Sequence, residues 1–216
     1  IGYNKYESNG REFDYLAINT NSSIVSYKEV RQAISRAINR ENIVSQIYGN
    51  KYRVQNYFLD YGSWLAGTKS DMSYNPDTAR EILQNNGWEF SYGKWRKYIN
   101  YSTKNINFRL VVQSSNERRV AIAEMIKENL GELGINVTIV KATDNQYQTY
   151  LNNKNYDMII TGITLGLTPN LETFFGQDNL ANYTNEEIST ILNEVKNITK
   201  NDLLKEKYAR IREIYN

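Results

Sequence analysis

The clearest alternation of hydrophobic and polar residues lies between Asn105 and Gly162. Its first segment, Ile106 to Val112, places an apolar residue at every second position, which is typical of a strand with one buried face. From Val120 to Leu133 the apolar residues recur at helical spacing, and Gly134 then supplies the left-handed position that ends many helices. The pattern predicts a strand followed by a helix.

The rest of this stretch repeats the same two elements. Residues 135–139 alternate again, a shorter helix through Leu151 begins at Thr143 or Asp144, and residues 156–161 form a third apolar strand. A β-α-β-α-β order uses right-handed crossovers and builds a parallel sheet with helices on its faces. We therefore predict an α/β fold, a mixed sheet with a parallel core and flanking helices.

Two serine–glutamate pairs have the spacing of a helix capping box. Ser26 precedes Glu29 by three residues, and Ser114 precedes Glu117 by three. In such a box the serine side chain accepts a hydrogen bond from a backbone N–H in the first turn of the helix, and the glutamate side chain accepts one from the backbone N–H of the serine. We expect Ser26 and Ser114 to cap the two helices that follow.

The flanking segments contain shorter signals. They predict a strand at 13–19, a helix opened by Asn75-Pro76-Asp77, a hairpin at 88–99 and two amphipathic helices between 186 and 215. Residues 51–69 have no clear period, so we expect a long loop there. Long loops in compact domains are often functional.

Small polar residues follow the strands of the central stretch. In open α/β sheets, ligands bind outside the carboxyl ends of the strands. The candidate ligand-binding residues at these ends are Ser114, Ser115, Thr161, Gly162, Ile163, Thr164 and Gly166. The alternative for Ser114 is a purely structural cap, as described above.

Composition limits the possible functions. A chain of 216 residues fits a single domain spanning 1–216. Lys+Arg 26 against Asp+Glu 24 gives a net charge of +2, too balanced to predict nucleic-acid or membrane-surface binding. With Cys 0 and His 0 there is no disulfide, thiol nucleophile, imidazole base or Cys/His metal site in these residues. We expect no catalysis, no cofactor and no bound metal.

Two other functional classes share a βαβ core. A nucleotide- or phosphate-using enzyme would carry a glycine-rich phosphate loop, but no G-x-G-x-x-G or G-x-x-x-x-G-K-[ST] follows a predicted strand. A ligand-sensing domain of a regulatory protein remains open, and a DNA-binding or transmembrane module in the same protein would favour it.

Five sequence blocks together carry a family resemblance. They are FDYLAINT, VRQAISRAINRENIV, YNPDTAREILQNNGW, RRVAIAEMIKENLGELGINV and YDMII. In this order they resemble the extracellular solute-binding proteins of family 5, the oligopeptide, dipeptide and nickel receptors of ABC importers. The resemblance runs from about Phe13 to about Tyr215.

The resemblance implies a fold and a function. Family members have two lobes hinged around a cleft, the type II periplasmic-binding-protein fold, and this chain is similar to the second, C-terminal lobe without the N-terminal lobe. The implied function is capture of an extracellular oligopeptide by hinge closure and its delivery to an ABC permease. The expected partners are an oligopeptide or other small polar solute, the permease membrane subunits and the N-terminal lobe, with no nucleic acid. The expected location is the extracellular face of the cell membrane, lipid-anchored in the full-length protein, or the periplasm.

One departure from the family concerns the ligand. In peptide-binding members the turn after the strand at 156–161 usually supplies a Trp and an Asp, and the Asp pairs with the amino terminus of the peptide. Here the turn is Gly162 to Asn170, and its first following carboxylate is Glu172. We expect this amino-terminus clamp to be absent. Peptide binding by backbone pairing and binding of a non-peptide solute such as an oligosaccharide both remain open, whereas nickel is disfavoured without His or Cys.

The resemblance also adds candidate ligand contacts outside the strand ends. Tyr61 and Trp64 lie in the long loop that approaches the cleft in the family, with core packing as the alternative. Glu117 matches a cleft-facing polar position, with its capping-box role as the alternative.

Arg118-Arg119 is expected to be a solvated pair, and Trp88 and Trp95 are expected to pack in the core.

Overall fold

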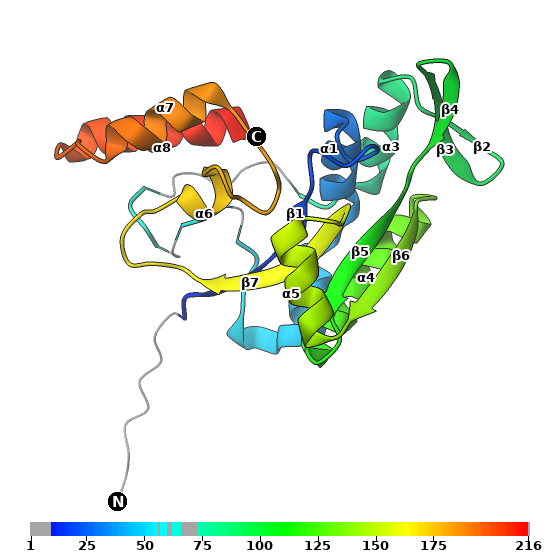
Figure 1. The fold of residues 1–216 in the computed structure, drawn as a ribbon, viewed down its shortest axis with the longest axis horizontal. Coiled ribbons are helices and arrows are strands. Elements are labelled where there is room, and N and C mark those ends of the chain that lie inside the picture. Colours follow the sequence, from blue (N-terminus) through cyan, green and yellow to red (C-terminus); the bar gives the residue numbers. More distant parts are fainter. Residues whose placement is uncertain (1–9, 56, 60–61, 66–72, 216) are drawn as a thin grey trace, which may run out of the picture.

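The computed structural model describes residues 10–55, 57–59, 62–65 and 73–215, which form an α/β fold (Figure 1). The strands are β1 (Glu12–Ile18), β2 (Glu89–Ser91), β3 (Lys94–Ile99), β4 (Ser102–Asn105), β5 (Asn107–Gln113), β6 (Asn136–Ala142) and β7 (Met158–Thr164). The helices are α1 (Lys28–Ala37), α2 (Arg40–Ile43), α3 (Pro76–Asn85), α4 (Glu117–Glu132), α5 (Asp144–Asn153), α6 (Glu172–Phe175), α7 (Glu186–Val195) and α8 (Asn201–Tyr215). A π-helical segment at Val44–Tyr48 and a 3₁₀ turn at Gly49–Lys51 follow α2.

The main sheet has the strand order β1-β7-β5-β6. β5 runs parallel to both β6 and β7, and β1 joins the β7 edge antiparallel. The chain moves outward from β5 to β6 through α4 and then returns past β5 to β7 through α5 (Figure 1). The prediction of a mixed sheet with a parallel core and flanking helices is confirmed.

Both faces of β5 pack against helices. Leu110 and Val112 pack in an apolar cluster with residues of α1, α3 and α4, while Val111 packs on the opposite face with Tyr147 of α5. A parallel strand between helices is buried on both faces, and β5 is accordingly apolar without a break from Leu110 to Val112. Burying one leucine of this kind contributes about 1.5–3 kcal/mol.

A further apolar cluster lies where β1 and β7 continue toward α6, α7 and α8. Its buried members are Tyr57, Leu59, Leu65, Leu165, Leu171, Phe174, Phe175, Ile188, Ile191, Leu192, Tyr208 and Ile211. Phe58 stacks on Phe174 with ring centroids 4.2 Å apart. The predicted C-terminal helices are confirmed, and this cluster attaches them to the main sheet.

Both predicted capping boxes are wrong. α1 begins after Tyr27 without a side-chain cap, and the hydroxyl of Ser26 donates to the Ser23 carbonyl instead. α4 is capped by Asn116, whose side chain accepts from the Arg119 N–H at 3.1 Å. Asparagine is as good an N-cap as serine, and Asn116 directly precedes the first helical residue. The helix therefore begins later than the serine–glutamate spacing indicated.

The cap of α5 and the buried tryptophans match expectation. Thr143 caps α5, and Gln146 completes the capping box by accepting from the Thr143 N–H at 3.0 Å. Trp88 and Trp95 are buried, and Trp95 donates to the Leu133 carbonyl at 2.8 Å. Both tryptophans serve the core, as predicted.

Two strands differ from the sequence prediction. β7 continues through Thr164, because β1 pairs with it along its full length and extends the ladder to Glu12 opposite Thr164. β4 was not predicted, and it pairs antiparallel with β3 after a turn at Asn100 and Tyr101. In the described part of the chain, no helix is long and apolar enough to cross a membrane.

Candidate ligand-binding site

The carboxyl ends of β5, β6 and β7 lie at one end of the main sheet (Figure 1). Because the chain leaves β5 in one direction and later returns past it, the crevice at this end is a topological switch point, where open α/β sheets bind ligands. The segments that follow these strands form the candidate site, as the sequence predicted from their polar residues.

A carboxylate links two of these segments. Asp144, at the start of α5, accepts hydrogen bonds from Ser115 Oγ at 2.6 Å and from Gln113 Nε2 at 3.0 Å. These bonds, the one from Ser115 first, hold the pKa of Asp144 below its usual range. Asp144 therefore acts as an ionised acceptor that fixes the loop after β5 against the start of α5.

The first hollow at this end, which we name the Ser115 hollow, is open and polar. It has a volume of about 540 Å³ and is lined by Gln113, Ser115, Asn116, Glu117 and Arg118. Glu117 lines this hollow, and because Asn116 caps α4, the capping-box alternative for Glu117 is removed.

Arg118 is held beside two aromatic rings. Its guanidinium lies 5.1 Å from the ring centroid of Tyr48 and 5.9 Å from that of Tyr52. Such cation–π contacts orient an exposed guanidinium without neutralising it. Sequence reasoning missed both tyrosines, because the π-helical segment and the turn after it have no regular hydrophobic period.

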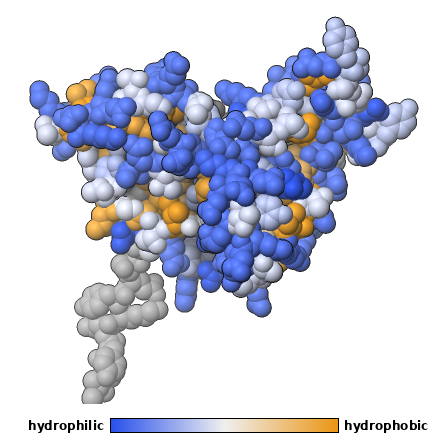
Figure 2. Space-filling view, in the orientation of Figure 1, coloured by the Kyte–Doolittle hydropathy of each residue, from blue (hydrophilic) through white to orange (hydrophobic). Residues whose placement is uncertain are grey.

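The second hollow, which we name the Trp64 hollow, lies between the long loop and the segment joining β7 to α6. It has a volume of about 210 Å³ and is lined by Phe58, Leu59, Gly62, Ser63, Trp64 and residues 165–170. Trp64 is 49% exposed and Leu167 is 82% exposed. Figure 2 shows apolar surface on the side where the β7–α6 segment lies. Exposed apolar side chains beside a hollow are typical of a binding surface.

A half-buried ion pair joins α4 to β1 at this end of the sheet. Arg119 Nη2 lies 2.8 Å from Asp14 Oδ1, and the Tyr48 hydroxyl donates to the other oxygen of the same carboxylate. Burial, and then this hydrogen bond to Asp14, raises the pKa of Tyr48. The prediction that Arg119 is part of a solvated pair is therefore wrong.

The ion pair depends on Gly162. A Cβ built at this position would overlap both Arg119 Nη2 and Asp14 Oδ1. Gly162 therefore provides the space in which the guanidinium crosses β7 to reach β1. The ion pair covers this stretch of β7, and the Asp14 carboxylate opposite Gly162 is already engaged.

The remaining predicted residues do not all reach the two hollows. Thr161 is buried and Ile163 packs in the cluster around Phe174, whereas Ser114 and Thr164 are exposed at the strand ends. The structure brings Trp64 together with Gly166 in one hollow and Ser115 together with Glu117 in the other. Tyr61 lies outside the described residues.

The described residues do not assemble a metal-binding group of three or more acidic, histidine or cysteine side chains. Glu172, the first carboxylate after the β7 turn, pairs with Lys196 at 2.9 Å.

Curated relatives match most of this chain. The chain is 28% identical over 208 residues to "Peptide transport periplasmic protein SapA" of Haemophilus influenzae, which covers 88% of this chain and 34% of the relative. It is 26% identical over 208 residues to "Oligopeptide-binding protein AppA" of Bacillus subtilis, covering 91% of this chain and 38% of the relative. The chain therefore spans little more than a third of the length of these relatives.

Solved structures show the same fold. AppA of Bacillus subtilis in complex with a nonapeptide superposes with a TM-score of 0.83 at 24% identity, covering 94% of this chain and 42% of that one. NikZ of Campylobacter jejuni in complex with Ni(L-His) gives a TM-score of 0.82 at 21% identity, covering 92% and 41%. Residues 1–185 match the family described as bacterial extracellular solute-binding proteins, family 5 Middle, and the chain belongs to this family.

Proposed function

We propose that this chain is the second, C-terminal lobe of a two-lobe solute-binding protein that captures oligopeptides for an ABC importer. The observation that carries the proposal is the pair of solvent-open hollows beside the carboxyl ends of β5 and β7, in a chain of family 5. The names of the relatives, a peptide transport protein and an oligopeptide-binding protein, support a peptide as the ligand.

The mechanism follows from the geometry of this end of the sheet. An opposing N-terminal lobe would close over the carboxyl ends of the strands and enclose the ligand between two surfaces. Trp64 and Leu167 would bury apolar side chains of the ligand. Ser114, Ser115, Glu117 and Thr164 would hydrogen-bond its backbone amides, and the closed form would be recognised by the permease subunits.

The ligand would be held without a charged clamp on its amino terminus. Residues 162–170 contain no carboxylate, and the nearby Asp14 already binds Arg119 and Tyr48. A buried ammonium without a counterion is costly, so the amino group would not be buried against this turn. Acetylating the amino terminus of a bound peptide should therefore change its Kd by less than roughly threefold, well under the tenfold that about 1.4 kcal/mol corresponds to.

The location follows SapA of Haemophilus influenzae, which is named as a periplasmic peptide transport protein. We propose that this protein works outside the cytoplasmic membrane, in the periplasm or lipid-anchored at the cell surface. It performs no chemistry on its ligand in this proposal, because capture and release need only closure and opening.

Native mass spectrometry of the full-length protein, purified from its own cells, tests the ligand class. A ladder of co-purified peptide masses is the expected result. A single carbohydrate mass would contradict the peptide assignment and favour an oligosaccharide, the second candidate, for which the exposed Trp64 and the acid-free turn are also suitable.

A matched pair of variants locates the contact surface. Trp64→Ala removes the aromatic wall of the Trp64 hollow and should weaken ligand binding roughly tenfold or more, as loss of a buried aromatic anchor does. Tyr101→Gly removes an exposed aromatic ring at the β3–β4 turn, away from both hollows, and should leave the ligand Kd unchanged. Equal effects of the two variants would contradict the proposed site.

A further inference from the structure

The small sheet β2-β3-β4 presents tyrosines to solvent at both of its turns. Tyr92, between β2 and β3, is 92% exposed, and Tyr101, between β3 and β4, is 95% exposed. Tyr98, on the outer side of β3, is 70% exposed, whereas Trp95 on the inner side is buried in the main core. Packing explains the inner face of this sheet and leaves the three tyrosines without a role in the fold.

The backbone conformation at the two turns is unfavourable for tyrosine. Tyr92 has φ 52° and Tyr101 has φ 62°, in the left-handed region where side chains with a Cβ are rare. Tyr101 follows Asn100 at φ 49°, and glycine is the residue normally found after asparagine in such a turn. A position that breaks a local rule without a packing gain is where a functional constraint is expected.

The net charge of the segment that forms the small sheet is more positive than that of the whole chain. Residues 89–105 contain Lys94, Arg96, Lys97 and Lys104 against one acid, Glu89, a net charge of +3 when the whole chain has +2. Lys97 lies on the Trp95 side of β3, 3.8 Å from Glu29, and Lys104 is paired opposite it, so Lys94 and Arg96 are the basic residues on the same side of β3 as Tyr98. The Arg96 guanidinium lies 5.7 Å from the Tyr92 ring, which places charge and aromatic surface together at one turn.

We propose that the small sheet is a membrane-contact surface that binds anionic lipid headgroups. Tyrosine rings are favoured at the level of the headgroups, where the ring is partly buried and the hydroxyl stays wet. Basic side chains beside them are attracted to the negative surface potential of anionic lipid. The tyrosines and the positive charge of this sheet match those two requirements.

The arrangement of the tyrosines favours a bilayer over a protein partner. Tyr92 and Tyr101 lie at opposite ends of β3, which spans six residues and so about 20 Å. Protein interfaces concentrate their binding energy in a clustered, desolvated centre. Separate projecting rings instead suit a broad and deformable surface, and Figure 2 shows pale side chains projecting at the small-sheet end of the molecule.

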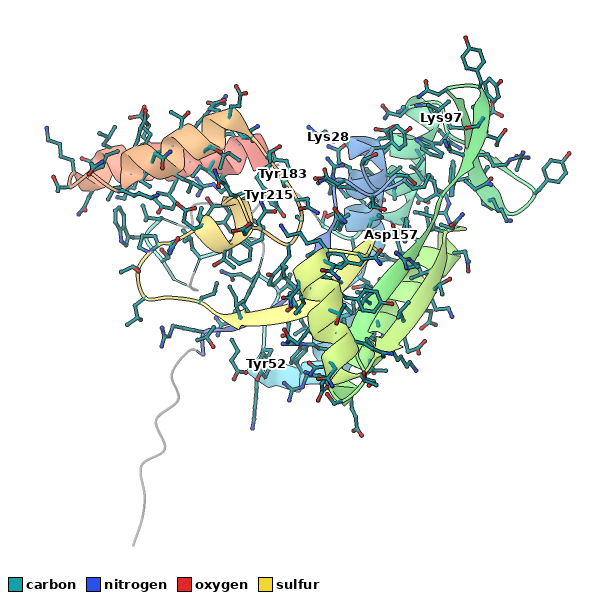
Figure 3. The ribbon with its side chains drawn as sticks, in the orientation of Figure 1. Lys28, Tyr52, Lys97, Asp157, Tyr183 and Tyr215 are labelled. Carbon is teal, nitrogen blue, oxygen red and sulfur yellow. The ribbon has the colours of Figure 1, made fainter. Side chains whose placement is uncertain are left out.

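The small sheet lies away from the candidate ligand site. β4 leads almost directly into the amino end of β5, whereas the two hollows lie beside the carboxyl ends of the main sheet. In Figure 3, Lys97 of β3 lies at the upper right of the molecule, whereas Tyr52, which contacts Arg118 of the Ser115 hollow, lies at the bottom. Lipid contact through the small sheet would leave the ligand site free.

Vesicle flotation tests the proposal with the purified full-length protein, made without lipid modification. The protein should float with phosphatidylcholine vesicles that contain phosphatidylglycerol, less so as salt is raised, and only weakly with phosphatidylcholine alone. The double variant Tyr92→Gly/Tyr101→Gly should bind the anionic vesicles roughly tenfold more weakly, since each lost ring removes inserted apolar area. Its melting temperature should stay equal or rise, because glycine suits both φ values.

A charge-matched pair provides the control. Lys94→Gln/Arg96→Gln and Lys51→Gln/Lys200→Gln lower the net charge equally, but only the first pair lies in the small sheet. The first should weaken vesicle binding and reduce its salt dependence, and the second should match the parent protein. Equal effects of the two pairs would overturn the proposal.

Other outcomes would also overturn it. They are the absence of binding to anionic vesicles, equal binding to neutral and anionic vesicles, and unchanged binding by the double glycine variant. A concentration-dependent dimer that the glycine variant abolishes would assign this face to self-association. The ligand Kd of the glycine variant is measured in parallel and should be unchanged. A loss of vesicle binding alone therefore tests the lipid surface and not the proposed transport function.

Discussion

Arg119 Nη2 lies 2.8 Å from Asp14 Oδ1, and this ion pair occupies the space beside the Cα of Gly162. It joins the first turn of α4 to the edge strand β1 across β7. Since both side chains are less than a third exposed, solvent screens the pair less than it screens a surface pair. The three residues therefore act together to fix the loop after β5 relative to the end of β7.

Gly162→Ala should destabilise the protein. The added methyl group overlaps both charged side chains, so the ion pair must separate or the strand must shift, and overpacking of this kind costs about 1–3 kcal/mol. Urea denaturation measures the loss. In the background Asp14→Ala/Arg119→Ala the cost of the methyl group should largely disappear, and an undiminished cost there would contradict this explanation.

Gly131→Ala should have the opposite effect. Gly131 lies near the end of α4, and a Cβ built there meets nothing within 4 Å. Alanine in a helix is more stable than glycine by about 0.5–1 kcal/mol, because it loses less backbone entropy on folding. The same urea measurement should therefore show a gain in stability, and a loss would indicate an unrecognised contact at this position.

Asn116→Ala should cost about 1 kcal/mol of stability, because it removes the side chain that caps α4. Ser114→Ala provides the matched control. Ser114 is exposed, and the hydrogen bond from its backbone N–H to the Ala142 carbonyl is retained in the variant. Thermal unfolding of the two variants should separate the actual cap from the one that the sequence spacing indicated, and a larger effect at Ser114 would reverse that assignment.

The protein should lose stability at alkaline pH. Burial, followed by the nearby Tyr147, raises the pKa of Tyr15 to about 12 from an ordinary value of 10.0. The stabilising contribution of neutral Tyr15 is complete below pH 10.0 and is lost as the pH rises toward about 12. Tyr15→Phe should therefore make the decline of melting temperature over this range shallower. An unchanged decline would show that other buried tyrosines account for it.

The sequence was sufficient for the α/β core because its strands are short, apolar and separated by periodic helices. β5 and β7 are buried between helices, and such strands carry the strongest local signal. β4 has the sequence Ser102 to Asn105, with no apolar alternation, and so gave no signal. Its pairing is imposed by β3 and by the turn at Asn100.

The candidate site was only partly predictable, because its key contact is not local. Asp14 and Arg119 are 105 residues apart, and each looks like an ordinary surface residue in its own segment. Strand ends identify which loops lie at the ligand end of the sheet, but they do not show which polar groups are already paired there. Ser115 was predicted as a ligand contact, and its bond to Asp144 became apparent only in the fold.

The pairing of β1 with β7 has a consequence for how the chain folds. Glu12 pairs with Thr164 and Ile18 with Met158, so almost the entire α/β core separates the partners along the chain. Contacts between such distant residues form late, because the entropy of closing the intervening loop must be offset first. β1 precedes the other three strands of this sheet in the chain, yet it cannot take its place in the sheet until β7 has been synthesised. The pairing of β1 with β7 is therefore the part of the sheet that must wait until nearly all of the core has been synthesised.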